Sequence, residues 1–144
     1  MRPVLRKPAA ASNSEAAQQQ EDFVEIDPIK HFGDSYFGIF CAKLEDLTIL
    51  SHQNCQNFPK IEKFVLSAEI RSCLSQITKL SLAASKKYYK KNTLQELDIE
   101  IEFLRLLIRK SFRLSYISAK QYLLWVSSIN NLGRLVGGWI KNQK

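Results

Sequence analysis

The chain has 144 residues, of which 45 % are hydrophobic, and a formal net charge of +7. This length suits one domain and this hydrophobic content is enough for a buried core, which excludes a fully disordered chain. No apolar run reaches the roughly 18 to 20 uncharged residues that a membrane-spanning helix needs. The sequence therefore predicts a globular, non-membrane protein.

The N-terminal part differs in composition from the rest. Residues 1–22 are rich in Ala, Ser and Gln and have almost no large apolar side chains after Leu5. They cannot offset the entropy of ordering, which predicts a flexible tail. Residues 23–33 predict an extended connector because they combine apolar side chains with Pro28 and Gly33. We expect a tail and connector over 1–33 and a helical domain over 34–144.

Glycine and proline are absent from the 73 residues 60–132. A β-rich domain of that length needs frequent turns, which usually recruit one or the other. The distribution therefore predicts an all-α domain of long helices. A first helix should start between Asp34 and Ala42 and end before Phe58-Pro59, because the residue before a proline is disfavoured in the α region.

The second helix is expected over about residues 61–88, and a lysine cluster lies at its end. The cluster surrounds Tyr88 and Tyr89 and consists of Lys86, Lys87, Lys90 and Lys91. Cations near a helix C-terminus interact favourably with its dipole, which is the structural interpretation. Four within six residues exceed what capping needs, so we also consider them a binding surface.

The third helix is predicted to open with a T-x-x-E capping box, Thr93 and Glu96. It carries two apolar faces, whereas a helix in a simple bundle needs only one. The first face consists of Leu94, Leu97, Ile101, Leu104, Ile108 and Phe112, and the second of Ile99, Phe103, Leu106 and Leu107. An apolar surface of that kind left in water promotes association, so the second face predicts burial against another subunit.

A strip of arginines separates these two faces at i, i+4 and i+8: Arg105, Arg109 and Arg113. The planar guanidinium fork holds a phosphate or carboxylate with two hydrogen bonds, which favours a binding role. The alternative for Arg105 and Arg109 is an ion pair with Glu102 or with a carboxylate of a neighbouring subunit.

The fourth helix should start at Ser118, which forms an S-x-x-Q capping box with Gln121, and continue to about Lys141. Gly133 and Gly137 lie four apart on one face, where each costs about 1 kcal/mol relative to Ala. Either a neighbouring helix backbone approaches closely there, or the helix end frays. Trp125 and Trp139 could stack on nucleic-acid bases, but their core spacing favours burial.

Short connections predict that consecutive helices run antiparallel, giving an up-and-down four-helix bundle. Its charge is uneven, because residues 1–57 carry a net −3 and residues 58–144 a net +10. Residues 103–144 contain 8 basic and no acidic side chains. The basic surface thus belongs to the folded half, where a rigid patch can attract nucleic acid.

Cysteine and histidine offer little catalytic chemistry. The three cysteines, Cys41, Cys55 and Cys73, are odd in number and contain no C-x-x-C pair. This predicts reduced, partly buried thiols in a cytoplasmic protein rather than disulfides or a zinc site. His31 and His52 fit no catalytic arrangement, and the inward Glu and Glu-x-x-His ligands of a metal-binding bundle are absent. We expect no catalytic residues, no metal and no cofactor.

Three segments resemble a known family of four-helix-bundle proteins. They are F-P-K at 58–60 with the following Lys63-Phe64 and Ile70-Arg71, L-R-L-L-I-R at 104–109, and L-G-R-L-V-G-G-W-I at 132–140. The family includes the accessory variability determinant (Avd) of diversity-generating retroelements and proteins encoded by intervening sequences in bacterial ribosomal RNA genes. The resemblance covers about residues 43–141. Lys63 stands where arginine is usual, Ser67-Ala68 replaces a common glycine-containing pair, and residues 1–42 have no counterpart.

The resemblance implies a non-catalytic, strongly basic homopentamer that binds a reverse transcriptase and nucleic acid and supports mutagenic retrohoming. The residues that we expect to bind RNA or DNA or the reverse transcriptase are Lys86, Lys87, Lys90, Lys91, Arg105, Arg109, Arg113, Arg134 and Lys141. The alternative is an intervening-sequence-type bundle that acts as a structural or protein-interaction module without a retroelement partner. Neighbouring genes, rather than this sequence, separate the two hypotheses.

Overall fold

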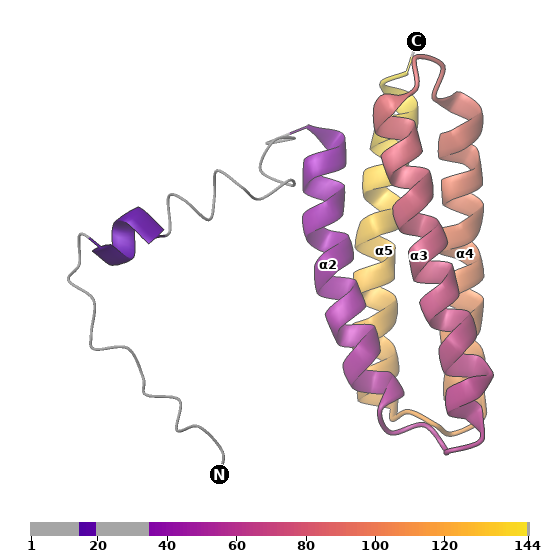
Figure 1. Cartoon of the computed structure of the whole chain (residues 1–144). Coiled ribbons are helices and arrows are strands. Elements are labelled where there is room, and N and C mark those ends of the chain that lie inside the picture. Colours follow the sequence, from indigo (N-terminus) through magenta and orange to yellow (C-terminus); the bar gives the residue numbers. More distant parts are fainter. Residues whose placement is uncertain (1–14, 20–34, 144) are drawn as a thin grey trace.

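The computed structural model describes residues 15–19 and 35–143. The predicted tail and connector over 1–33 lie outside this part, apart from a short helix over 15–19. The remaining described residues form one body of helices joined by short connections (Figure 1). Its elements are α2 (Tyr36–Cys55), the 3-10 helix η2 (Glu62–Phe64), α3 (Leu66–Lys86), α4 (Lys91–Arg113) and α5 (Ala119–Lys141).

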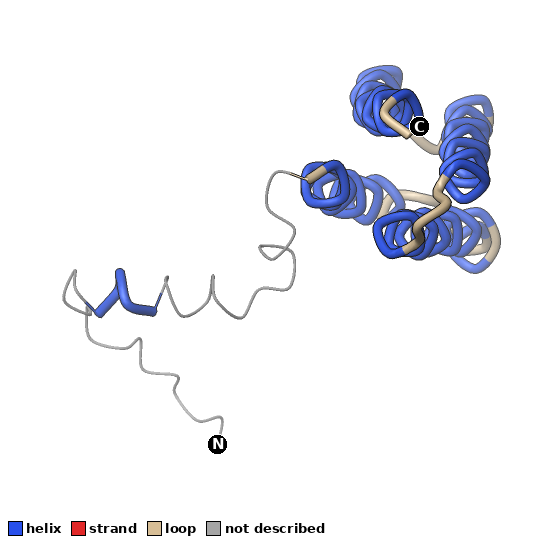
Figure 2. Tube along the Cα trace, turned by 90° about the horizontal axis from the view of Figure 1, so that it is seen from above, coloured by secondary structure: helices blue, strands red, loops and turns tan. Residues whose placement is uncertain are grey.

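Consecutive helices run antiparallel, and each packs on two neighbours: α2 and α4 both contact α3 and α5 (Figure 2). The all-α prediction is confirmed, and the packing agrees with an up-and-down bundle. The α3–α4 turn and the C-terminus of α5 lie at the same end of the body. No helix in the described part of the chain is long and apolar enough to cross a membrane.

A single core runs between the four helices. Phe40, Ile77, Ile101 and Ile129 contribute side chains from α2, α3, α4 and α5, and all are buried. Trp125 is the largest fully buried side chain, which confirms that the tryptophans belong to the core. Its indole Nε1 donates a hydrogen bond of 2.8 Å to Ser51 Oγ, so the one polar atom of the ring has a partner inside the core.

Two helices begin with the side-chain caps that their sequences favour. Ser35 Oγ accepts from Gly38 N at 3.1 Å before α2. Ser118 and Gln121 form the predicted reciprocal capping box before α5, with Ser118 Oγ accepting from Gln121 N at 3.1 Å and Gln121 Oε1 accepting from Ser118 N at 2.8 Å. The predicted start and end of α5 are therefore confirmed.

The capping box predicted at Thr93 is wrong. Helix α4 already begins at Lys91, and its N-cap, Lys90, forms no side-chain cap. Thr93 lies inside the first turn, where it is buried and accepts a hydrogen bond of 3.1 Å from Lys87 Nζ. Thr93 therefore packs beneath the lysine-rich turn and does not cap α4.

Helix α3 begins later than the expected Ile61. Residues Glu62–Phe64 form η2, and Val65 has φ −113° and ψ −79°, which separates η2 from the regular helix that starts at Leu66. Phe58 nevertheless reaches the core, where its ring packs on Tyr116 with centroids 5.5 Å apart. The F-P-K segment thus closes the end of the body opposite the α3–α4 turn.

Neither explanation offered for the α5 glycines holds in the described body. A Cβ on Gly133 would meet Arg105 Nη2 at 3.5 Å, and one on Gly137 would meet nothing within 4 Å. No helix backbone approaches either residue that closely. The helix also continues past both to Lys141, so its end does not fray at Gly137.

The three cysteines are free thiols, as predicted. Burial, followed by the nearby Glu45 carboxylate, raises the pKa of Cys41 to about 11. Burial and Glu100 raise the pKa of Cys73 to about 12, and Cys73 Sγ donates to Glu100 O at 3.3 Å. Burial also raises the pKa of Cys55. All three are therefore protonated at neutral pH and behave as small apolar side chains.

Candidate nucleic-acid interface

The structure separates the predicted basic residues into two groups. The end cluster lies on the α3–α4 turn and the end of α5, and the arginine strip lies along the second half of α4 (Figure 1). From Lys91 to Arg105 the distance along α4 is about 21 Å at 1.5 Å per residue. The end cluster consists of Lys86, Lys87, Lys90, Lys91 and Lys141, and the arginine strip of Arg105, Arg109 and Arg113.

Two lysines of the end cluster support the turn itself. Lys90 Nζ donates to Lys87 O at 2.6 Å and to Ala84 O at 2.7 Å, at the point where α3 ends. Lys87 Nζ donates to Thr93 Oγ1 at 3.1 Å. These ammonium groups satisfy backbone and hydroxyl acceptors, which is the structural interpretation of the cluster. The side chains of Lys86 and Lys91 are exposed, and neither ammonium group has a hydrogen-bond partner within the described residues.

The arginine strip also contains both paired and unpaired side chains. Arg105 forms an ion pair with Glu102 and donates through Nε to Asn130 Oδ1 of α5 at 3.1 Å. The ion-pair alternative therefore applies to Arg105. Arg109 and Arg113 are exposed, and neither pairs with a carboxylate in the described part of the chain. Their guanidinium groups are available to a phosphate or to an acidic partner.

Arg134 and Lys141 add positive charge on α5. Arg134 donates through Nη2 to Asn131 Oδ1, one helical turn earlier, and its side chain is exposed. Lys141 is exposed in the last turn of the helix. Helix α5 contains no acidic residue, so nothing on it neutralises these charges.

The second apolar face of α4 is largely uncovered. Ile99 is 67 % exposed and Leu106 58 %, and Phe103 between them is also exposed. Leu107, which we placed on this face, is buried in the core instead. The three exposed side chains point away from the core, because residues 3, 4 and 7 apart share one side of a helix.

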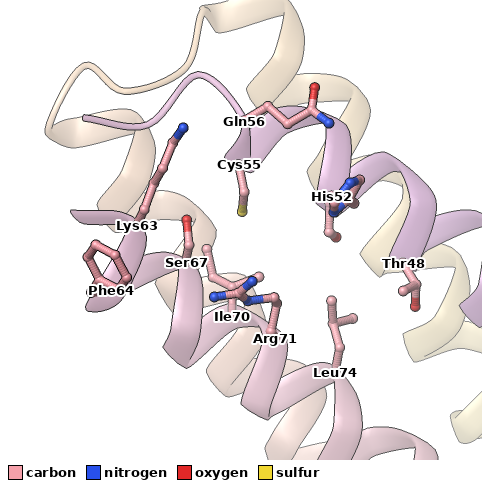
Figure 3. A pocket seen from close by; sticks show the side chains of 11 residues that line it. Thr48, His52, Cys55, Gln56, Lys63, Phe64, Ser67, Ile70, Arg71 and Leu74 are labelled. Atoms are coloured by element: carbon pink, nitrogen blue, oxygen red, sulfur yellow. The ribbon is translucent and has the colours of Figure 1, made fainter. Parts of the chain in front are cut away.

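A pocket of about 380 Å³ opens between α2 and the η2–α3 segment (Figure 3). His52 and Cys55 line it from α2, while Lys63, Phe64 and Arg71 come from the other wall. The exposed surface of the lining is mainly apolar, although hydroxyl, imidazole, amide and basic side chains contribute to it, and none of the described lining residues is acidic. This site suits an apolar group that carries negative charge.

A family model described as bAvd-like matches residues 39–143. The chain belongs to the bAvd-like family. The match includes most of α2, which extends the predicted resemblance toward the N-terminus. Neither the curated proteins nor the solved structures contain a significant match to the chain.

The fold brings residues of the three segments that resemble family motifs into contacts between helices. Lys63, Phe64 and Arg71, from the first motif, all line the pocket between α2 and α3. Arg105 and Gly133, from the second and third motifs, meet where α4 crosses α5. The motifs of this bAvd-like chain therefore mark contacts between helices.

Two features were not predicted as sites. The pocket was missed because its walls come from segments on both sides of Pro59, and only the fold shows that they face each other. The second is the pair Tyr88 and Tyr89 in the lysine-rich turn. Two adjacent aromatic residues among lysines were a visible signal for it.

Proposed function

We propose that this protein is a non-catalytic accessory subunit of a diversity-generating retroelement, which binds the reverse transcriptase and nucleic acid in the cytoplasm. The observation that carries the proposal is its membership of the bAvd-like family over residues 39–143. The charge distribution supports it, because residues 103–144 contain eight basic and no acidic side chains.

Nucleic-acid binding follows from this charge by counterion release. Each Lys or Arg that contacts a phosphate releases condensed cations, so binding weakens steeply as salt rises. In a homopentamer the five basic halves would together carry a charge of about +50, which strengthens the effect. Arg109, Arg113 and Arg134 are the exposed guanidinium groups that we assign to phosphate or to the reverse transcriptase.

The variant Arg109→Glu/Arg113→Glu tests the arginine strip. It should bind a single-stranded RNA at least about tenfold more weakly, and the slope of log K against log salt should flatten by about 0.7 for each phosphate that the variant no longer binds. Fluorescence anisotropy over a salt series measures both quantities. The matched control is Lys43→Glu/Lys79→Glu, which makes the same change in net charge with exposed lysines of α2 and α3.

Binding that falls equally in both variants would reflect net charge alone and would contradict a site on α4. The double variant should also keep its helical circular dichroism, because both arginines are exposed. Unchanged binding would move the site to the end cluster.

Co-purification tests the reverse-transcriptase partner. The protein should co-elute with the reverse transcriptase encoded beside it, together with the template RNA. If the gene instead lies within a ribosomal RNA operon, without a reverse transcriptase and its repeats, the intervening-sequence alternative replaces the proposal.

A further inference from the structure

The turn between α3 and α4 presents two aromatic rings to solvent. Tyr88 is 87 % exposed and Tyr89 85 %, and their ring centroids are 4.8 Å apart in an edge-to-face arrangement. Surface turns usually recruit Gly, Pro, Asn, Asp or Ser, since these residues suit the backbone and the solvent. Two neighbouring tyrosines leave apolar ring surface in water that no contact within the described body covers.

The turn that carries the rings is held by its own lysines. Lys90 Nζ binds the carbonyls of Ala84 and Lys87 at the end of α3, and Lys87 Nζ binds Thr93 in the first turn of α4. Both ammonium groups are directed at the protein. Tyr88 and Tyr89 lie between these two lysines, on a turn that the hydrogen bonds hold in place. A ligand that binds the rings therefore costs less conformational entropy of the turn.

Positive charge flanks the rings on both sides. Lys86 ends α3 and Lys91 begins α4, and both side chains are exposed. Aromatic faces beside a basic backbone-binding surface are the two components that proteins use to hold single-stranded nucleic acid: bases stack on the rings while cations contact phosphates. Bases in a duplex are stacked within the helix and do not offer their faces.

We propose that Tyr88 and Tyr89 form a stacking platform for unpaired bases of single-stranded RNA or DNA, with Lys86 and Lys91 contacting the adjacent phosphates. The proposal rests on the nucleic-acid binding of the proposed function and assigns it a second, sequence-tolerant site. The platform starts about 12 Å along α4 from Ile99, the first exposed residue of the apolar face, so it is separate from that surface.

The test uses the full chain and three fluorescent probes: an unstructured 15-nucleotide RNA, the DNA of the same sequence, and the corresponding DNA duplex. Tyr88→Ala/Tyr89→Ala should weaken binding of a single strand about tenfold or more, because each stacked base contributes substantially to affinity. Duplex binding and the salt slope should stay unchanged, because no charge is removed. Comparison of the RNA and DNA arms identifies which single strand the platform prefers.

Two further variants separate stacking from other effects. Tyr88→Phe/Tyr89→Phe keeps the rings and should keep the affinity, whereas Tyr88→Leu/Tyr89→Leu keeps apolar bulk without a ring and should bind as weakly as the alanine variant. The matched control is Leu123→Ala/Leu124→Ala, which removes apolar side chains that are 68 % and 55 % exposed at the start of α5, at the end of the body opposite the α3–α4 turn. This control should bind like the unaltered protein, and circular dichroism should show that every variant keeps its helices.

The outcomes distinguish the platform from the proposed function. If the unaltered chain binds none of the probes, the nucleic-acid function itself fails and the platform with it. If it binds single strands with a steep salt dependence but the alanine and leucine variants bind equally well, the platform is overturned and the function stands. Loss of reverse-transcriptase co-purification with unchanged nucleic-acid binding would make the rings a protein contact and would also overturn it.

Discussion

At the scale of single residues, the hydrogen bond between Trp125 and Ser51 shows how a polar group is accommodated in the core. Ser51 Oγ donates to Leu47 O at 2.7 Å within α2 and accepts from Trp125 Nε1 at 2.8 Å from α5. One hydroxyl therefore satisfies an indole N–H that would otherwise be buried without an acceptor. A serine with this role looks like any other serine in the sequence.

Removing that hydroxyl should destabilise the protein. Ser51→Ala leaves Trp125 Nε1 without an acceptor, which costs about 1–3 kcal/mol of unfolding free energy. Urea unfolding followed by circular dichroism measures the loss. The control is Ser85→Ala, which removes a hydroxyl that only donates to Leu82 O within α3 and should change stability little. Equal losses in the two variants would contradict the role of Ser51.

The buried thiols predict how stability changes at alkaline pH. Burial raises the pKa of Cys41 from an ordinary value near 9 to about 11, and that of Cys73 to about 12. In the unfolded chain both ionise near pH 9, so above that pH the unfolded state binds fewer protons. Their contribution to stability is complete below pH 9 and is lost as pH rises through 11 and 12.

Urea unfolding at pH 8, 9, 10 and 10.5 should therefore show declining stability. Cys41→Ala/Cys73→Ala is less stable at pH 8 because it leaves cavities, but its stability should decline less steeply with pH. All other ionisable residues are the same in both proteins, so the difference in slope isolates the thiols. Parallel slopes would show that the thiols do not contribute.

At the scale of elements, the sequence predicted a helix start correctly where the capping residues bind only each other. Ser118 and Gln121 need only each other, and the structure forms their box as expected. Thr93 has the same spacing to Glu96, yet α4 begins two residues earlier, at Lys91, and the Thr93 hydroxyl accepts a hydrogen bond from Lys87 Nζ. The residue at which α3 ends decides which lysines bind its last carbonyls and which face solvent. The sequence predicts that end only to within several residues.

The α5 glycines give a prediction for this element. A methyl group at Gly137 would contact nothing within 4 Å, and one at Gly133 would make an ordinary contact with the flexible end of Arg105. Alanine at each position should therefore stabilise the isolated chain by up to about 1 kcal/mol through helix propensity. Thermal and urea unfolding of the single variants measure this gain.

Protein concentration separates the chain's own stability from association. A variant that is less stable only at concentrations where the protein self-associates would show that a second copy packs against these glycines. A loss of stability at every concentration would contradict the open space seen beside Gly137.

At the scale of the whole molecule, periodicity predicted the helices and most of the core, since one apolar stripe per helix can be counted in the sequence. The end cluster and the arginine strip were also visible as residue types. Their distance from each other, the pairing of Arg105 with Glu102 and the pocket between α2 and α3 were not, because each depends on how the chain folds in three dimensions.

Self-association is the prediction that belongs to this scale. Ile99 and Leu106 are exposed apolar residues on one side of α4, and a second copy that covers them would remove this surface from water. We expect the unaltered chain to be a pentamer and Ile99→Glu/Leu106→Glu to be a folded monomer. Light scattering after size-exclusion chromatography measures both masses.

The control for association is Ile49→Glu/Ile61→Glu, which introduces the same charges at two exposed isoleucines of α2 and the η2 region. It should leave the mass unchanged. An unaltered chain that is monomeric at micromolar concentration would show that the second apolar face does not join subunits.

The part of α4 after Glu102 and the whole of α5 contain no acidic side chain, and this affects how a bound polyanion would be released. From residue 103 onward the chain contains arginine and lysine but neither carboxylate side chains nor histidine. Without a carboxylate side chain among these residues, a bound polyanion would be held by contacts with cations that weaken as salt rises. Added salt or a competing polyanion would therefore displace it, which makes ionic strength the switch for its release.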